Sequence, residues 1–332
     1  MHIRHQHVYR NVVVMPGWSE IKNESQVRVT PQNPNGGVFF LVEQKKRYLR
    51  ELSEHTGRNT ILYFSAFLNK QRADALINDR DINAFMETVH KLDRKKGLDL
   101  ILHTPGGDIS ATEQIIKYLR SMFDGDIRAI IPQMAMSAGS MIAVSSRSIM
   151  MGKQSCLGPF DPQINGLPCQ SVLKEFDRAV RDVSSNPSSL GLWQAIISKL
   201  HPTFLTICQQ ADELSRELAD DILKYSQYSD EVRAEIKRVF VDNGDSKVHS
   251  RHIDVQRCKD TGLNIESLES DSVVQDLVLS IHHCCMILGE ASNLVKIVEN
   301  NIGGEYSLHL PPQQPQVPGP LMQFQIGEPQ MP

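Results

Sequence analysis

Residues 98–146 read LDLILHTPGGDISATEQIIKYLRSMFDGDIRAIIPQMAMSAGSMIAVSS. The run Leu98–Thr104 is short and apolar, which is typical of a buried strand, and Asp126–Pro132 is a second run of the same kind. Between them, residues 109–123 repeat apolar side chains at helical spacing. Alternation of strand and helix with short links predicts right-handed βαβ crossovers on a parallel sheet.

The segments on either side extend this pattern. We expect a helix over 38–54, strands over 59–66 and from residue 148, and helical segments over 169–240 and 271–300. The predicted fold class is therefore α/β, with a mostly parallel sheet and an appended helical segment.

Composition divides the chain into four parts. Residues 1–36 are polar and rich in turn formers, so we expect an irregular arm there. The α/β domain is predicted over 37–265 and a C-terminal helical segment over 266–310. Residues 311–332 are rich in proline and glutamine and almost uncharged, and such a composition predicts a disordered tail.

The charge balance and hydropathy exclude some classes of protein. With 35 basic and 39 acidic side chains the formal net charge is −4, which favours neither nucleic acid nor an anionic membrane as a partner. No run of 18 apolar residues occurs, and the apolar stretch Val12–Met15 is too short for a signal peptide. We therefore expect a cytoplasmic protein that does not insert into a membrane, and its six cysteines do not suggest a disulfide framework.

Two turns made of small residues follow two of the predicted strands. Gly106 and Gly107 directly follow the first strand, where their N–H groups could stabilise an oxyanion, although a tight turn without function is an equal alternative. Ser137 is flanked by the small residues Ala135, Ala138 and Gly139. It could be a nucleophile at a strand-to-helix junction, or it could simply be a helix N-cap. Ser137 comes 30 residues after Gly107, about one helix and one strand, so both turns should reach the same edge of the sheet.

Three stretches together resemble the serine dehydrogenase proteinase family, a relative of the signal peptide peptidases and Clp proteases. They are LILHTPGGDISATEQIIKYLRS (100–121), AIIPQMAMSAGSMIAVSS (129–146) and MMGKQSCLGPFDPQI (150–164). The resemblance implies a Clp protease/crotonase-like fold of repeated ββα and βαβ units, acting on a peptide or protein substrate. It also implies that Ser137 is the nucleophile and that N–H groups of Gly107 (or Gly106) and Ala138 form the oxyanion hole. A helical segment after the core commonly packs on a neighbouring subunit in this architecture, so we expect a homo-oligomer.

The general base departs from the Clp pattern. A Clp-type histidine would lie about 25 residues after the serine, yet Leu157–Ile164 contains no histidine. The signal peptide peptidase branch uses a Ser–Lys dyad, and Lys174, 37 residues after Ser137, is the best-placed lysine. Lys199 and His252 are the alternatives. A lysine base must have a lowered pKa, which requires burial or neighbouring cations.

No metal or cofactor site is predicted. In the tract His282-His283-Cys284-Cys285, only His282 and Cys285 would share a face of a helix. Neither a Walker loop nor a GxGxxG fingerprint occurs, so we expect an ATP-independent enzyme without a nicotinamide cofactor.

Three functions fit the sequence. The first is a serine peptidase that works through an acyl-enzyme on Ser137. The second is a crotonase-like acyl-thioester enzyme, in which the paired turns would stabilise an enolate, although no carboxylate adjoins the serine. The third is an inactive scaffold or partner-binding protein that keeps the fold.

Overall fold

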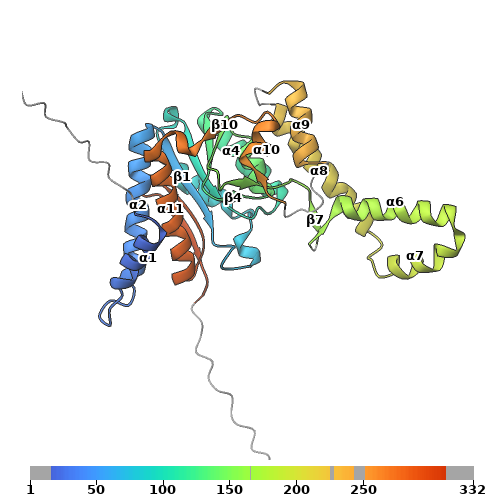
Figure 1. Ribbon diagram of the computed structural model, residues 1–332, viewed down its shortest axis with the longest axis horizontal. Helices are drawn as coiled ribbons and strands as arrows, with labels where there is room; N and C mark the ends of the chain where they lie inside the picture. Colours follow the sequence, from blue (N-terminus) through green and yellow to red (C-terminus); the bar gives the residue numbers. More distant parts are fainter. Residues whose placement is uncertain (1–15, 165, 225–227, 243–250, 312–332) are drawn as a thin grey trace, which may run out of the picture.

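The computed structural model describes residues 16–164, 166–224, 228–242 and 251–311. Within these residues, seven strands form the central sheet in the order β10-β5-β3-β2-β1-β11-β12 (Figure 1). The neighbours from β10 to β1 run parallel, and β11 and β12 pair antiparallel at one side. In sheet order the strands are Ile265–Ser267, Ser148–Met151, Ile127–Ile131, Leu98–His103, Asn59–Ser65, Leu294–Asn300 and Glu305–His309. The α/β class with a mostly parallel sheet is confirmed.

Helices cover both faces of this sheet and enclose two apolar cores. One core lies between the sheet and α1, α2 and α11, and the other lies between the sheet and α3, α4, α5 and parts of α8 and α9. Leu98, Leu100 and Leu102 of β2 belong to the second core, whereas Ile101 belongs to the first, as the alternation of a strand requires. The helices are Trp18–Val27 (α1), Gly36–Thr56 (α2), Asp81–Val89 (α3), Ile109–Phe123 (α4), Ala138–Val144 (α5), Phe204–Lys224 (α8), Asp230–Phe240 (α9), Val255–Asp260 (α10) and Ser272–Ala291 (α11).

Two smaller sheets and a helical arm complete the fold. The strands β4, β6 and β9 form a short second sheet beside the carboxyl end of β2, and β7 pairs with β8 at the root of the arm. The helices α6 and α7 project away from the sheet on the right of Figure 1. These elements span Met134–Ala135 (β4), Cys156–Leu157 (β6), Gln163–Ile164 (β7), Leu167–Pro168 (β8), Ile253–Asp254 (β9), Cys169–Ser185 (α6) and Leu190–Ile197 (α7).

Two of the predicted segments differ from the structure. The arm expected to be irregular over 1–36 contains α1, while residues 1–15 and the tail 312–332 lie outside the described residues. The helix expected over 271–300 ends at Ala291, and Leu294–Asn300 is instead the strand β11. Lys296 and Glu299 of β11 are both buried in ion pairs, so their charges do not mark the exposed face of a helix.

By length and composition alone, α11 could cross a membrane. Most of it is buried in the described structure, where Leu277, Ile281 and Leu288 pack in the core that it shares with α2 and the sheet. This is the environment of a core helix.

Candidate active site

The two small-residue turns lie against each other at the carboxyl end of β2. Thr104 pairs with β4: its N–H donates to Met134 O at 3.2 Å, and its carbonyl accepts from Met136 N–H at 3.0 Å. A Cβ atom added to Gly106 would lie only 2.8 Å from the Cβ of Ser137. The expected meeting of the turns at one sheet edge is therefore what the structure has.

Ser137 has a strained backbone. Its φ is 49° and its ψ is −119°, a combination that non-glycine residues seldom adopt. It occupies the N-cap position of α5, but its side chain makes no capping hydrogen bond. A capping role therefore does not explain Ser137, and the strained strand-to-helix turn matches the geometry of a nucleophile elbow.

The two glycines of the loop after β2, Gly106 and Gly107, differ in detail. Gly106 adopts φ +95°, and its N–H donates to Thr104 Oγ1 at 3.2 Å. Gly107 pairs with Ile77 as in a parallel ladder: Ile77 N–H donates to Gly106 O at 2.8 Å, and Asp108 N–H donates to Ile77 O at 2.9 Å. Because successive residues of an extended segment point in opposite directions, the N–H of Gly107 faces away from Ile77. Gly107 is therefore better suited than Gly106 to donate to a substrate.

Ser140 anchors the turn that carries Ser137 and was not singled out in the sequence. Its hydroxyl donates to Ala135 O at 2.6 Å and accepts from Gly158 N–H at 2.8 Å. It therefore joins α5 to β4 and to the end of β6. The signal that could have found it is the second serine of Ser137-Ala-Gly-Ser140, one turn into the helix, where only a buried polar partner would favour a serine.

The model of the ClpP-like SDH-type serine proteinase family matches residues 42–279. The chain belongs to this family. Two uncharacterized proteins of Methanocaldococcus jannaschii are similar to it: one is 26% identical over 67% of this chain and 73% of its own length, the other 27% identical over 70% and 75%. This match confirms the resemblance to the serine dehydrogenase proteinase family. At the family level, it supports the activity of a serine peptidase.

The three candidate bases of this ClpP-like chain lie on other elements. Lys174 is exposed on α6, Lys199 is exposed just after α7, and His252 is exposed beside the start of β9. In the part of the chain that the structure describes, none of them hydrogen bonds to Ser137. The strand β9 pairs with β6, which pairs with β4, so His252 lies two strands away from the turn that carries Ser137.

His103 lies close to the loop in sequence but on the other face of the sheet. Its ring stacks on Phe64 at 5.1 Å between centroids and meets the ring of His282 at 4.9 Å. Neither ring nitrogen of His103 has a hydrogen-bond partner among the described residues. Those same residues contain no group of three or more metal-ligating side chains, and the tract His282–Cys285 is split between His282 beside His103 and Cys285 beside Lys45.

Acid is expected to destabilise the protein through His103. Burial lowers its pKa from 6.5 to about 3, so between these values the unfolded chain binds a proton that the folded protein does not. The free energy of unfolding should therefore fall as the pH drops from 6.5 towards 3, by at most about 1.4 kcal/mol per pH unit for this one group. Urea unfolding of the wild type and His103→Phe at pH 6.5 and 4.5 measures it. The variant should lose less stability than the wild type between pH 6.5 and pH 4.5. If it loses as much as the wild type, or if His90→Phe, a change at an exposed histidine, has the same effect as His103→Phe, then His103 is not the cause of the acid sensitivity.

Proposed function

We propose that the protein hydrolyses peptide bonds through an acyl-enzyme on Ser137, without ATP. The observation that carries this proposal is the strained backbone of Ser137, held against Gly106 with its hydroxyl not used in capping. Strain of this kind costs about 1–3 kcal/mol and persists where function requires it, which an inactive scaffold would not need.

In the proposed reaction, Ser137 Oγ attacks the scissile carbonyl and its proton passes to the general base. The carbonyl oxygen becomes an oxyanion that accepts hydrogen bonds from the N–H groups of Gly107 and Ala138. The C–N bond then breaks, the base returns the proton to the leaving amine, and water hydrolyses the ester to release the acid and restore Ser137.

Labelling with a fluorophosphonate tests the nucleophile. We expect the wild type to take up one label, mapped by mass spectrometry to the peptide that contains Ser137, and Ser137→Ala to take up none. Ser140→Ala, a serine three residues away in the same peptide, separates the sites: it should keep some label. Equal labelling of wild type and Ser137→Ala would overturn the proposal.

We propose Lys174 as the base, supplied within a homo-oligomer. A lysine that acts as a general base must be buried or lie beside other cations, and Lys174 is exposed on α6, so it needs to be covered by another surface. The helical arm that carries it offers such a surface, because Val180 and Leu192 are 68% and 64% exposed. An apolar hollow of about 130 Å³ lies nearby between α6, α7 and α8, lined by Phe176, Trp193 and others. A second copy packed on this arm would cover these side chains.

Mixing inactive variants tests whether Lys174 acts between copies. Ser137→Ala and Lys174→Ala should each be inactive against a peptide ester, whereas an equimolar mixture, dissociated and reassembled, should recover about a quarter of wild-type activity if sites combine at random. Lys199→Ala and His252→Ala are matched controls that should stay active. Activity in Lys174→Ala alone would remove Lys174 as the base, and a mixture without recovery would show that Ser137 and Lys174 do not act across copies.

A further inference from the structure

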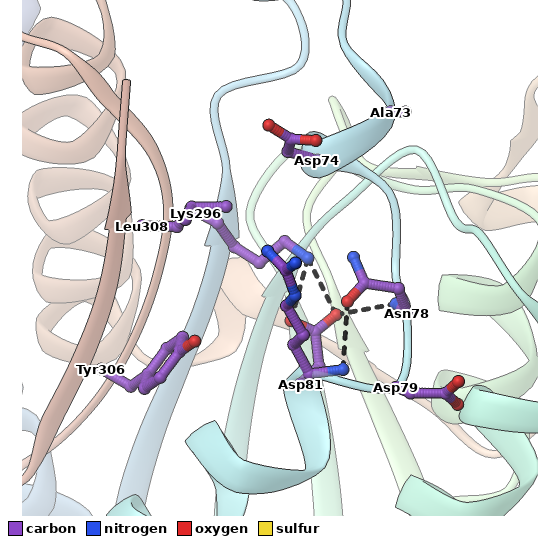
Figure 2. A pocket seen from close by; sticks show the side chains of 9 residues that line it. Ala73, Asp74, Asn78, Asp79, Asp81, Lys296, Tyr306 and Leu308 are labelled. Carbon is purple, nitrogen blue, oxygen red and sulfur yellow. Dashed lines mark hydrogen bonds and ion pairs between the residues drawn. The ribbon is translucent and has the colours of Figure 1, made fainter. Parts of the chain in front are cut away.

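A buried ion pair lies between β11 and the start of α3, outside the turn that carries Ser137. The side chains of Lys296 and Asp81 are 3% and 2% exposed, and Lys296 Nζ lies 2.9 Å from both carboxylate oxygens (Figure 2). The ammonium also donates to Leu76 O at 2.8 Å. Three acceptors around one nitrogen use all three N–H bonds of a protonated lysine.

These contacts fix a short piece of chain, residues 75–78, which we name the backing segment. The Asp81 carboxylate accepts from Asn78 N–H at 3.1 Å, and Ser65 Oγ donates to Ala75 O at 2.8 Å. A pocket of about 400 Å³ lies beside the ion pair, lined by Asn78, Asp81 and others. On this side, polar contacts hold the backing segment in place, while Ile77 itself packs in the apolar core that the sheet shares with α3 and α4.

The other side of the backing segment supports the loop of Gly106 and Gly107. Ile77 makes the two ladder hydrogen bonds to Gly106 O and Asp108 N–H that turn the N–H of Gly107 away from it. The approach is close: a Cβ atom added to Gly107 would lie 2.2 Å from Ile77 O. A shift of Leu76 would therefore move Ile77 and, through it, the Gly107 peptide.

We propose that Lys296 and Asp81 are positioning residues for the oxyanion hole, acting through the backing segment on the N–H of Gly107. The inference rests on the proposed function of Ser137 for its catalytic consequence. The structural part of the inference is that the ion pair holds Ile77 against Gly106 and Asp108. This part can be measured without an assay of activity.

The test uses the full chain and two double variants. Lys296→Met with Asp81→Asn removes the ion pair without leaving a lone buried charge, so that the fold is preserved. The control, Lys45→Met with Glu299→Gln, removes another buried ion pair that involves the same strand, with a nitrogen–oxygen distance of 2.5 Å and side chains 1% and 0% exposed. That pair joins β11 to α2, on the other face of the sheet from the backing segment.

Amide hydrogen exchange reports the structural part. We expect exchange at Ile77 and Asp108 to become about tenfold faster or more in the Lys296/Asp81 variant, and to stay as in the wild type in the control. Fluorophosphonate labelling of Ser137 should slow by about tenfold or more in the same variant relative to the control, with kcat for a peptide ester reduced and KM within about twofold.

The outcomes separate this inference from the proposed function. The positioning role is overturned if exchange at Ile77 and Asp108 is unchanged in the Lys296/Asp81 variant, or if it is accelerated equally in both double variants. It is also overturned if exchange becomes faster in the Lys296/Asp81 variant while the labelling of Ser137 and kcat stay normal. If the wild type is not labelled at all, the proposed function fails, and the exchange result alone then decides whether the ion pair positions the Gly107 loop.

Discussion

Ser137→Gly is expected to be inactive and at the same time more stable than the wild type. Loss of the nucleophile should lower kcat by about 10⁴-fold or more, as expected when a catalytic serine is removed. Because glycine adopts positive φ without strain, the backbone at φ 49° and ψ −119° should relax, and the free energy of unfolding should rise by about 1 kcal/mol.

Urea unfolding and fluorophosphonate labelling measure the two effects on one sample. Ser137→Ala is the first control: it loses the hydroxyl but keeps the strain, so it should be inactive without the gain in stability. Ser121→Gly, in the helix α4, is the second, and it should lose about 0.5–1 kcal/mol because glycine is unfavourable in a helix. A Ser137→Gly variant less stable than Ser137→Ala would show that the turn stores no strain for catalysis.

The sequence predicts the central sheet and the meeting of the two turns because both depend on local patterns. Short apolar runs, helical spacing and small residues at strand ends are readable within about 50 residues. The family resemblance added roles for Ser137, Gly107 and Ala138, and the structure refines one of them: the N–H of Gly106 is already bonded to Thr104 Oγ1, which leaves Gly107 as the better donor.

The parts that the sequence could not predict depend on contacts between distant residues. Lys296 meets Asp81 across 215 positions of the chain, and no local pattern distinguishes a lysine in a buried ion pair from one on a helix surface. The same ambiguity led to a helix being predicted where β11 lies. Ile77 was overlooked for a related reason, since it supports Gly106 and Gly107 through backbone atoms that any residue possesses.

The position of the proposed general base could not be predicted from the sequence for a different reason. Lys174 was chosen by its distance along the chain from Ser137, but its helix leads away from the sheet into the arm (Figure 1). Sequence separation says little about where a side chain on a projecting helix meets its partner. If the arm packs on a second copy, the contact that completes the site is between chains, and one chain alone does not contain it.

Gly106→Ala is expected to damage both activity and stability, because Gly106 packs closely against the turn that carries Ser137. Its Cβ would lie 2.6 Å from Met136 O and 2.9 Å from Ala138 N, so the two turns would have to move apart. Labelling of Ser137 should slow by about 100-fold or more, because the movement would displace the N–H of Gly107 from the proposed oxyanion hole, and the free energy of unfolding should fall by about 3 kcal/mol.

Gly303 provides a closely matched control for this substitution. It adopts φ +97°, against +95° for Gly106, but a Cβ atom there would meet nothing within 4 Å. Gly303→Ala should therefore show the effect of backbone strain alone: the free energy of unfolding should fall by about 1 kcal/mol. The labelling rate of Ser137 should stay as in the wild type. The difference between the two variants measures the close approach of the turns. If both lose the same stability and both keep their labelling rate, the contact between Gly106 and Ser137 has no part in forming the site.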